Sequence, residues 1–143
     1  MLFGRKKRSI HNVLIVEDEP LVAFDTEHFL GDEGFDIVAT VDSVADALNL
    51  IEGGAVIDLV LVDVRLADGS GIDVARAAHG RGIAALFVTG SCPTDAREFA
   101  AGCLSKPYSQ RDLIAAIDAI DAVKGGGTPK KLPGNFSLFP SAA

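Results

Sequence analysis

Ile57-Asp-Leu-Val-Leu-Val-Asp63 is the most strongly apolar stretch of the chain, and it is the clearest indication of the fold class. A short, continuous apolar run bounded by turn-forming residues is typical of a strand that is buried on both faces. Before this run, the helical pattern ends at Gly53-Gly54, and after it a loop is expected at Leu66-Ala-Asp-Gly69. A strand of this kind belongs to a parallel sheet that carries helices on both sides.

Strand and helix patterns alternate on both sides of this run. Four further stretches are typical of strands: 13–17, 35–41, 84–89 and 102–105. Helical patterns lie between them and after them, at 20–32, 42–52, 71–79 and 110–124, while residues 93–100 are expected to form only a short fourth helix. The alternation predicts an α/β fold: a flavodoxin-like, doubly wound, five-stranded parallel sheet in the order 2-1-3-4-5, with helices on both faces.

The length of 143 residues fits one compact domain with short tails. We place a basic N-terminal tail at residues 1–11, the domain at 12–124 and a flexible C-terminal tail at 125–143. The tail contains one unusually apolar run, Phe136-Ser-Leu-Phe139. Docking of this run on the domain or on a partner is the alternative to an idle tail.

Charge is divided unevenly between the domain and the tails. Residues 12–124 contain all 20 acidic residues and 7 basic ones, a net charge of −13, and the tails contain the other 6 basic residues. A body this acidic repels nucleic acid, so we expect no nucleic-acid binding by the folded domain. No apolar run is long enough to span a bilayer, and no cleavage site follows the basic start, so we expect a cytoplasmic protein. The two cysteines, Cys92 and Cys103, are expected to be small buried thiols, with a redox pair as the alternative.

Side chains that can carry chemistry stand where the predicted strands end. The first strand ends at Glu17 and Asp18, the third at Asp63 and the fourth at Thr89, and Lys106 follows the fifth. In the expected strand order these ends are neighbours. Carboxylates about 5 Å apart repel by roughly 3 kcal/mol per pair at an effective dielectric constant near 20, which favours a bound cation. Oxygen ligands suit Mg²⁺, and with this charge neutralised Asp63 can attack phosphorus to give an acyl phosphate.

Five motifs in this order resemble the response-regulator receiver domain of two-component signalling. The resemblance covers about residues 12–124 and lies in Leu14-Ile-Val-Glu-Asp-Glu-Pro20, Val60-Leu-Val-Asp63, Gly71, Val88-Thr89 and Lys106-Pro107. It implies that Asp63 is the phosphoacceptor. It also implies that Mg²⁺ is held by Glu17, Asp18, Asp63 and the backbone carbonyl of Arg65. In this family Thr89 would move to bond the phosphoryl group, and Lys106 would bridge to it.

The chain also departs from the family pattern. Leu66-Ala-Asp-Gly69, Phe87-Val-Thr-Gly90 and Lys106-Pro-Tyr108 resemble a single-domain subgroup nicknamed FAT GUY, but Ser91-Cys92 replaces the hydrophobic residue and tyrosine of that subgroup. Cys103 stands where most receivers have an aromatic residue that rotates when the threonine moves. The span from Thr89 to Lys106 is short for the family, which predicts a stunted and loosely held fourth helix.

The residues and the resemblance together predict a stand-alone response regulator and not an enzyme, apart from its own phosphoryl transfer and dephosphorylation. It would accept a phosphoryl group on Asp63 from a sensor histidine kinase or a phosphotransfer protein. It would then bind an output protein or act as a phosphate sink, as a monomer or weak dimer. One alternative is a constitutive, non-phosphorylated scaffold with the receiver fold. Another is a haloacid-type hydrolase, which requires a second aspartate where this chain has Arg65.

Overall fold

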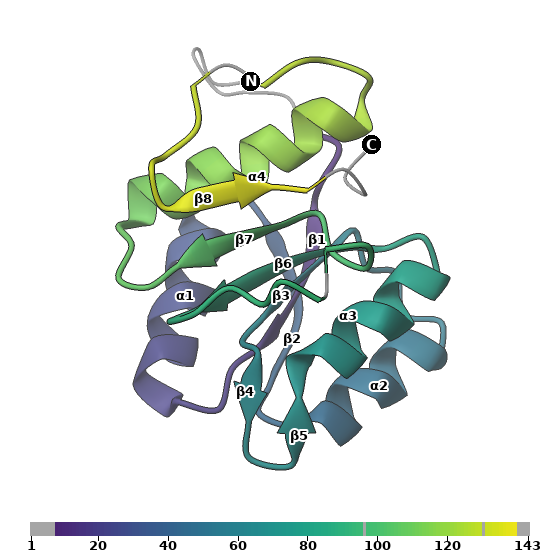
Figure 1. Ribbon diagram of the computed structural model, residues 1–143. Helices are drawn as coiled ribbons and strands as arrows, with labels where there is room; N and C mark the ends of the chain where they lie inside the picture. The colour runs from purple at the N-terminus through teal and green to yellow at the C-terminus, as the bar shows by residue number, and fades with distance from the viewer. Residues whose placement is uncertain (1–7, 96, 130, 140–143) are drawn as a thin grey trace.

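The computed structural model describes residues 8–95, 97–129 and 131–139. Its main sheet has six strands in the order β2-β1-β3-β6-β7-β8 (Figure 1). The strands are β1 (Asn12–Val16), β2 (Asp36–Val41), β3 (Leu59–Val62), β6 (Ala84–Thr89), β7 (Gly102–Ser105) and β8 (Phe136–Leu138). The helices are α1 (Pro20–Asp32), α2 (Val44–Glu52), α3 (Gly71–Gly80) and α4 (Gln110–Lys124). A small separate hairpin consists of β4 (Arg65–Leu66) and β5 (Gly69–Ser70).

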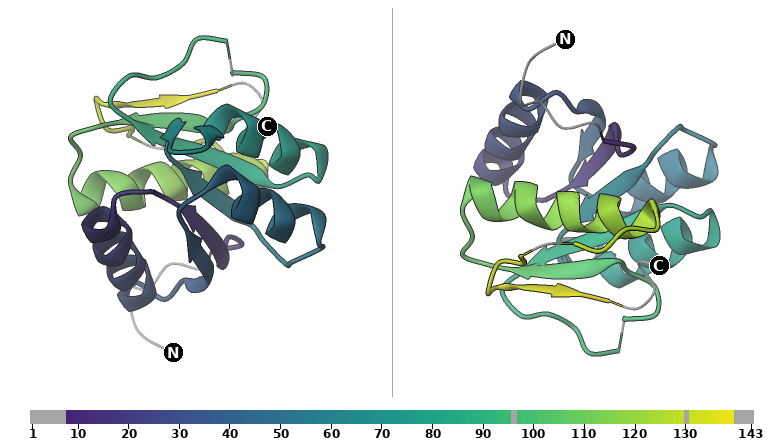
Figure 2. Two further views of the ribbon diagram at one scale, coloured as in Figure 1. Left: turned by 90° about the horizontal axis from the view of Figure 1, so that it is seen from below. Right: turned by 90° about the horizontal axis from the view of Figure 1, so that it is seen from above.

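Helices cover both faces of the sheet. Helices α1 and α4 lie on one face, and α2 and α3 lie on the other (Figures 1 and 2). Alternate side chains of a strand point to opposite faces, and the apolar core is divided accordingly. Leu59 and Leu61 belong to the cluster under α1 and α4. Val60 and Val62 belong to the cluster under α2 and α3. This explains why the stretch around β3 is continuously apolar and not alternating.

The predicted α/β fold is confirmed. The five strands β2, β1, β3, β6 and β7 pair in parallel, in the order that the sequence predicted. The expected short fourth helix is the exception, because the described residues between 93 and 100 form only bends and turns. This stretch has one large apolar side chain, the half-buried Phe99, and so offers little apolar surface to hold a helix against the sheet.

The C-terminal residues are not the idle tail that we expected. Phe136–Leu138 form β8, which pairs antiparallel with β7 and places Phe136 opposite Leu104. Phe136 and Phe139 are 7% and 4% exposed, and the Phe139 amide donates a hydrogen bond to the Ala101 carbonyl at 2.9 Å. The physical reason is that β7 would otherwise present an unpaired edge. The apolar run therefore docks on its own domain.

The N-terminal boundary also lies earlier than residue 12. Ile10 is 1% exposed, and the Arg8 side chain forms an ion pair with Asp118 at 2.7 Å. The Ser9 amide and hydroxyl both donate hydrogen bonds to the Asp121 carboxylate. Residues 8–10 thus pack along α4, and residues 1–7 of the predicted tail lie outside the described part of the chain. Among the described helices, none has the length and apolar character that a membrane crossing requires.

Candidate functional site

Parallel pairing brings the predicted site residues to one edge of the sheet. The Asp63 amide donates a hydrogen bond to the Val16 carbonyl at 3.1 Å, which places the end of β3 beside the end of β1. The Lys106 amide donates to the Thr89 carbonyl at 2.8 Å, which joins the ends of β7 and β6 in the same way. All parallel strands point in one direction, so residues that follow them meet at one rim.

Three carboxylates meet at this rim. Glu17, Asp18 and Asp63 each offer an oxygen atom, and these oxygen atoms lie within 4.8 Å of one another. Glu17 is 4% and Asp63 is 7% exposed, while Asp18 is half-buried. Burial raises the pKa of Glu17, and the amide of Glu19 and the charge of Lys106 offset only part of this effect. The cluster therefore holds more negative charge than its surroundings favour.

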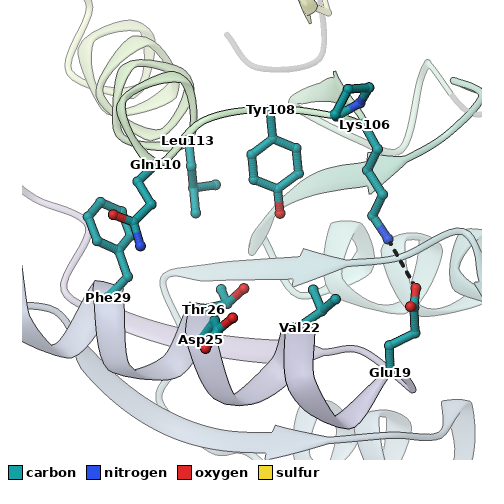
Figure 3. Close-up of a pocket in the computed structure, with 10 residues that line it drawn as sticks. Glu19, Val22, Asp25, Thr26, Phe29, Lys106, Tyr108, Gln110 and Leu113 are labelled. Atoms are coloured by element: carbon teal, nitrogen blue, oxygen red, sulfur yellow. Dashed lines mark ion pairs between the residues drawn. The ribbon is translucent and has the colours of Figure 1, made fainter.

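Lys106 supplies the counter-charge. Its Nζ atom lies 3.0 Å from Asp63 Oδ2, 3.6 Å from Glu17 Oε1 and 3.8 Å from Glu19 Oε1. Figure 3 shows the lysine extended toward Glu19 across the end of the sheet. Burial lowers the pKa of Lys106, but the hydrogen bond to Asp63 and the nearby carboxylates outweigh it, so its pKa is raised overall. Lys106 is thus held in its charged form beside the predicted phosphoacceptor.

The loop after β3 is held against Asp63 from two directions. The Arg65 amide donates a hydrogen bond to Asp63 Oδ1 at 3.2 Å. Gly71, the first residue of α3, lies directly against the Asp63 backbone, and a Cβ atom there would be 2.0 Å from the Asp63 carbonyl oxygen. Glycine is therefore required for this approach. The loop is also tied to α2, because the Asp68 carboxylate accepts hydrogen bonds from the Val44 and Ala45 amides at 2.8 and 3.2 Å.

An open cavity of about 650 Å³ lies over the carboxylates. Its lining includes Asp18, Asp63, Arg65, Thr89 and the turn Gly90–Pro93. Thr89 is 5% exposed, and its hydroxyl oxygen accepts a hydrogen bond from the Ser91 amide at 3.4 Å. The structure thus brings Thr89 and Arg65 to the same cavity as the acidic residues, with room beside Asp63 for a tetrahedral anion.

The two cysteines are not separate thiols, so our preferred prediction for them was wrong. Cys92, in the turn after β6, and Cys103, on β7, form a disulfide, with Cα atoms 6.0 Å apart. The sequence could not reveal this, because the cysteines are eleven positions apart and only the short connection between β6 and β7 brings them together. The disulfide occupies the position where most receivers have the mobile aromatic residue.

A second cavity, of about 460 Å³, opens between α1 and α4. Tyr108, Phe29 and Leu113 point into it, and Lys106 and Glu19 close one end (Figure 3). The ion pair between Glu19 and Lys106 was not singled out from the sequence. Burial raises the pKa of Tyr108. The acidic run at residues 17–19 was the available signal for Glu19.

Comparison with known proteins gives the same picture. The family described as response regulator receiver domain matches residues 13–118. Among curated relatives, the chain is 38% identical over 112 residues to the transcriptional regulatory protein PdtaR of Mycobacterium tuberculosis, covering 74% of this chain and 54% of that protein. It is 33% identical over 117 residues to the cell cycle transcriptional regulator CtrA of Caulobacter vibrioides, covering 76% and 49%. The chain therefore spans about half the length of these relatives.

Solved structures of receiver domains superpose on most of the chain. A CheY-like receiver domain protein from Methanospirillum hungatei JF-1 is 27% identical with a TM-score of 0.69, covering 77% of this chain and 92% of that one. A receiver protein from Sinorhizobium medicae WSM419 is 27% identical with a TM-score of 0.67, covering 77% and 93%. The sequence match covers most of the chain and the fold agrees with it. The chain belongs to the response regulator receiver domain family.

Proposed function

We propose that this receiver domain accepts a phosphoryl group on Asp63, in the presence of Mg²⁺, from a sensor histidine kinase or a phosphotransfer protein. The observation that carries the proposal is the 3.0 Å contact between Lys106 Nζ and Asp63 Oδ2 beside the clustered oxygen atoms of Glu17 and Asp18. A half-buried lysine paired with two of three clustered carboxylates has no evident purpose in holding the fold together. It does suit the transfer of a multiply charged anion to Asp63.

The donor set fits a divalent, oxygen-preferring cation. Glu17, Asp18 and Asp63 carry three negative charges against the single positive charge of Lys106, so two negative charges remain. At 4.8 Å each carboxylate pair repels by about 3 kcal/mol at an effective dielectric constant near 20. Carboxylate oxygens beside an open cavity suit Mg²⁺, which usually keeps ligand positions for phosphate oxygens. When bound, Mg²⁺ would neutralise charge on the phosphoryl oxygens.

The side chains around Asp63 fit the transfer step. A carboxylate oxygen of Asp63 attacks the phosphorus of a phosphohistidine, the new O–P bond forms and the P–N bond to the imidazole breaks. Lys106 is already within hydrogen-bonding distance of Asp63 and can pair with a phosphoryl oxygen. The Thr89 hydroxyl, on the wall of the same cavity, can donate to another.

The output of the phosphorylated domain is a second part of the proposal. We infer that phosphorylation changes the binding of another protein, and that rapid loss of the phosphoryl group to water is the competing outcome of a phosphate sink. The lifetime of the acyl phosphate separates the two. A sink loses its phosphoryl group quickly without any partner, whereas a switch retains it long enough for a partner to bind.

The test is phosphorylation by a small donor. The full chain is incubated with acetyl phosphate and Mg²⁺, beside an Asp63→Asn variant, and intact mass is measured. We expect the mass of one phosphoryl group on the parent and none on Asp63→Asn. A parent that gains no mass, although it is folded and binds Mg²⁺, would contradict the proposal and favour the non-phosphorylated scaffold.

A matched pair of variants tests the metal site separately. Asp18→Asn removes a carboxylate from the cluster, whereas Asp25→Asn removes an exposed carboxylate from the neighbouring helix α1. Calorimetric titration with MgCl₂ should show much weaker binding for Asp18→Asn and parent-like binding for Asp25→Asn. Equal Mg²⁺ affinities of the two variants would place the cation elsewhere.

A further inference from the structure

The disulfide joins the core of the domain to the wall of the phosphoacceptor cavity. Cys103 lies in β7, is fully buried and stands opposite Phe87 of β6. Cys92 is half-buried and lines the cavity that contains Asp63 and Thr89. Cys103 is therefore fixed by the sheet, and Cys92 belongs to a wall that a phosphoryl group would contact.

This covalent link holds the turn after β6 against β7. Cys92 Sγ lies 3.3 Å from the Ser105 hydroxyl, directly before Lys106, so the turn is anchored next to the end of β7. The described residues from 93 to 100 form bends and turns. Later in this stretch Phe99 lies against the His79 ring and the Arg76 guanidinium, and the Ala101 amide donates to the Ala85 carbonyl at 2.8 Å. Without the disulfide, the turn Gly90–Cys92 would lose its covalent attachment to β7.

We propose that Cys92–Cys103 is a redox modification site that controls how well the cavity binds a phosphoryl group, which rests on the function proposed above for Asp63. In the disulfide form Gly90–Cys92 stay in an arrangement that leaves about 650 Å³ open over the carboxylates. A wall already ordered in this form loses little conformational freedom when an anion arrives. In the reduced form the same residues must be ordered on binding, so the affinity falls.

The reaction needs a dithiol reductant of the thioredoxin class, and its atoms balance. A thiolate of the reductant attacks Sγ of Cys92, which is the more exposed residue of the pair. The bond to Cys103 breaks, and Cys103 leaves as a thiolate that takes up a proton. The second thiol of the reductant then resolves the mixed disulfide and releases the Cys92 thiol. Two electrons and two protons pass from the reductant to the cysteine pair, and the reductant becomes a disulfide.

The experiment compares the full chain in oxidised form, after treatment with dithiothreitol, and as a Cys92→Ser variant. Mass spectrometry after alkylation should count no free thiol in the oxidised protein and two after reduction. Amide hydrogen exchange in 90–95 and 97–101 should be faster in the reduced protein and in Cys92→Ser. Serine at position 92 is a mild replacement, because the site is half-buried and adjoins the Ser105 hydroxyl.

Binding of beryllofluoride with Mg²⁺ then provides the link to phosphorylation. We expect at least about threefold weaker binding for the reduced protein and for Cys92→Ser, since part of the binding energy goes into ordering the turn. Dithiothreitol should not affect Cys92→Ser. Equal affinities and equal exchange in both redox states would overturn the inference while leaving phosphorylation of Asp63 intact. If neither redox state binds beryllofluoride, the proposed function fails, and the proposed redox control of phosphoryl binding fails with it. Thiol counting and amide exchange would still show whether the two cysteines form a redox pair.

Discussion

Replacing Gly71 by alanine should disrupt the contact between α3 and the backbone of Asp63. The added Cβ atom would lie 2.0 Å from the Asp63 carbonyl oxygen and 2.9 Å from Val62 Cγ2. Ordinary contact begins at 3.4 Å, so helix and strand end must part by about 1.4 Å. Neither the carbonyl group nor the buried Val62 side chain can move aside easily, because β3 is paired on both edges.

The expected cost follows from the kind of atoms that collide. Overpacking in a close-packed interior costs about 1–3 kcal/mol, and we expect the upper end because one partner is backbone. Alanine is the better helix former by about 1 kcal/mol, which offsets part of this cost. The free energy of unfolding of Gly71→Ala should therefore fall by about 2 kcal/mol. Because the displaced residue is Asp63, Mg²⁺ affinity should fall as well.

The same helix provides the control. Gly80, the last residue of α3, has no atom within 4 Å of a Cβ placed on it. Gly80→Ala should be neutral or stabilising by up to about 1 kcal/mol. Urea unfolding followed by far-UV circular dichroism gives both free energies, provided that the denaturant slopes agree. If Gly71→Ala proves as stable as Gly80→Ala, then α3 does not press against Asp63 as described, and our account of how this loop is positioned is wrong.

Two further predictions concern Tyr108 and β8. Tyr108 is the only tyrosine and the chain has no tryptophan, so its ionisation can be followed directly by ultraviolet absorption, and burial should place its pKa above the ordinary value. The pKa of Tyr108 is higher in the folded than in the unfolded state, so the stability that its neutral phenol contributes is complete below the unfolded-state pKa. This contribution is lost as pH rises through the folded-state pKa. A titration midpoint at the free-tyrosine value would show that the ring is solvated. Phe136→Ala should lower the free energy of unfolding by about 3 kcal/mol, because the side chain loses its burial against β7. Ser137→Ala, on the exposed side of β8, should change this free energy little. Equal effects of the two substitutions in urea unfolding would mean that β8 is not packed on the sheet.

Most of the fold was predictable because its signals are local. The apolar run at β3, the Pro at the start of α1 and the serine cap of α4 each mark an element within a few residues of themselves. Strand polarity then places Glu17, Asp63 and Lys106 at one rim, since parallel strands all end on the same side of the sheet. The convergence of the acidic residues needed no information beyond strand order.

The features that sequence reasoning missed depend on contacts between distant residues. β8 is three residues long and pairs with a strand more than thirty positions earlier, so no periodic sequence pattern predicts it. Its register requires Gly102, because a Cβ atom there would lie 2.7 Å from the Phe136 ring. The disulfide likewise depends on the path of the chain between β6 and β7, two strands that pair with each other.

Charge balance at the rim connects the metal, the lysine and the turn that carries Cys92. The three carboxylates and the one lysine together carry a net charge of −2, which one divalent cation would cancel. The residues are Glu17, Asp18, Asp63 and Lys106. Converting the Asp63 carboxylate into an acyl phosphate adds up to one further negative charge, and the cation and lysine are already engaged. The remaining donors must come from the cavity wall, where Thr89 and the turn Gly90–Cys92 lie. The turn that would donate hydrogen bonds to the phosphoryl group is the one that the disulfide links to β7. The redox state of the cysteines and the phosphorylation of Asp63 would therefore act on the same few residues.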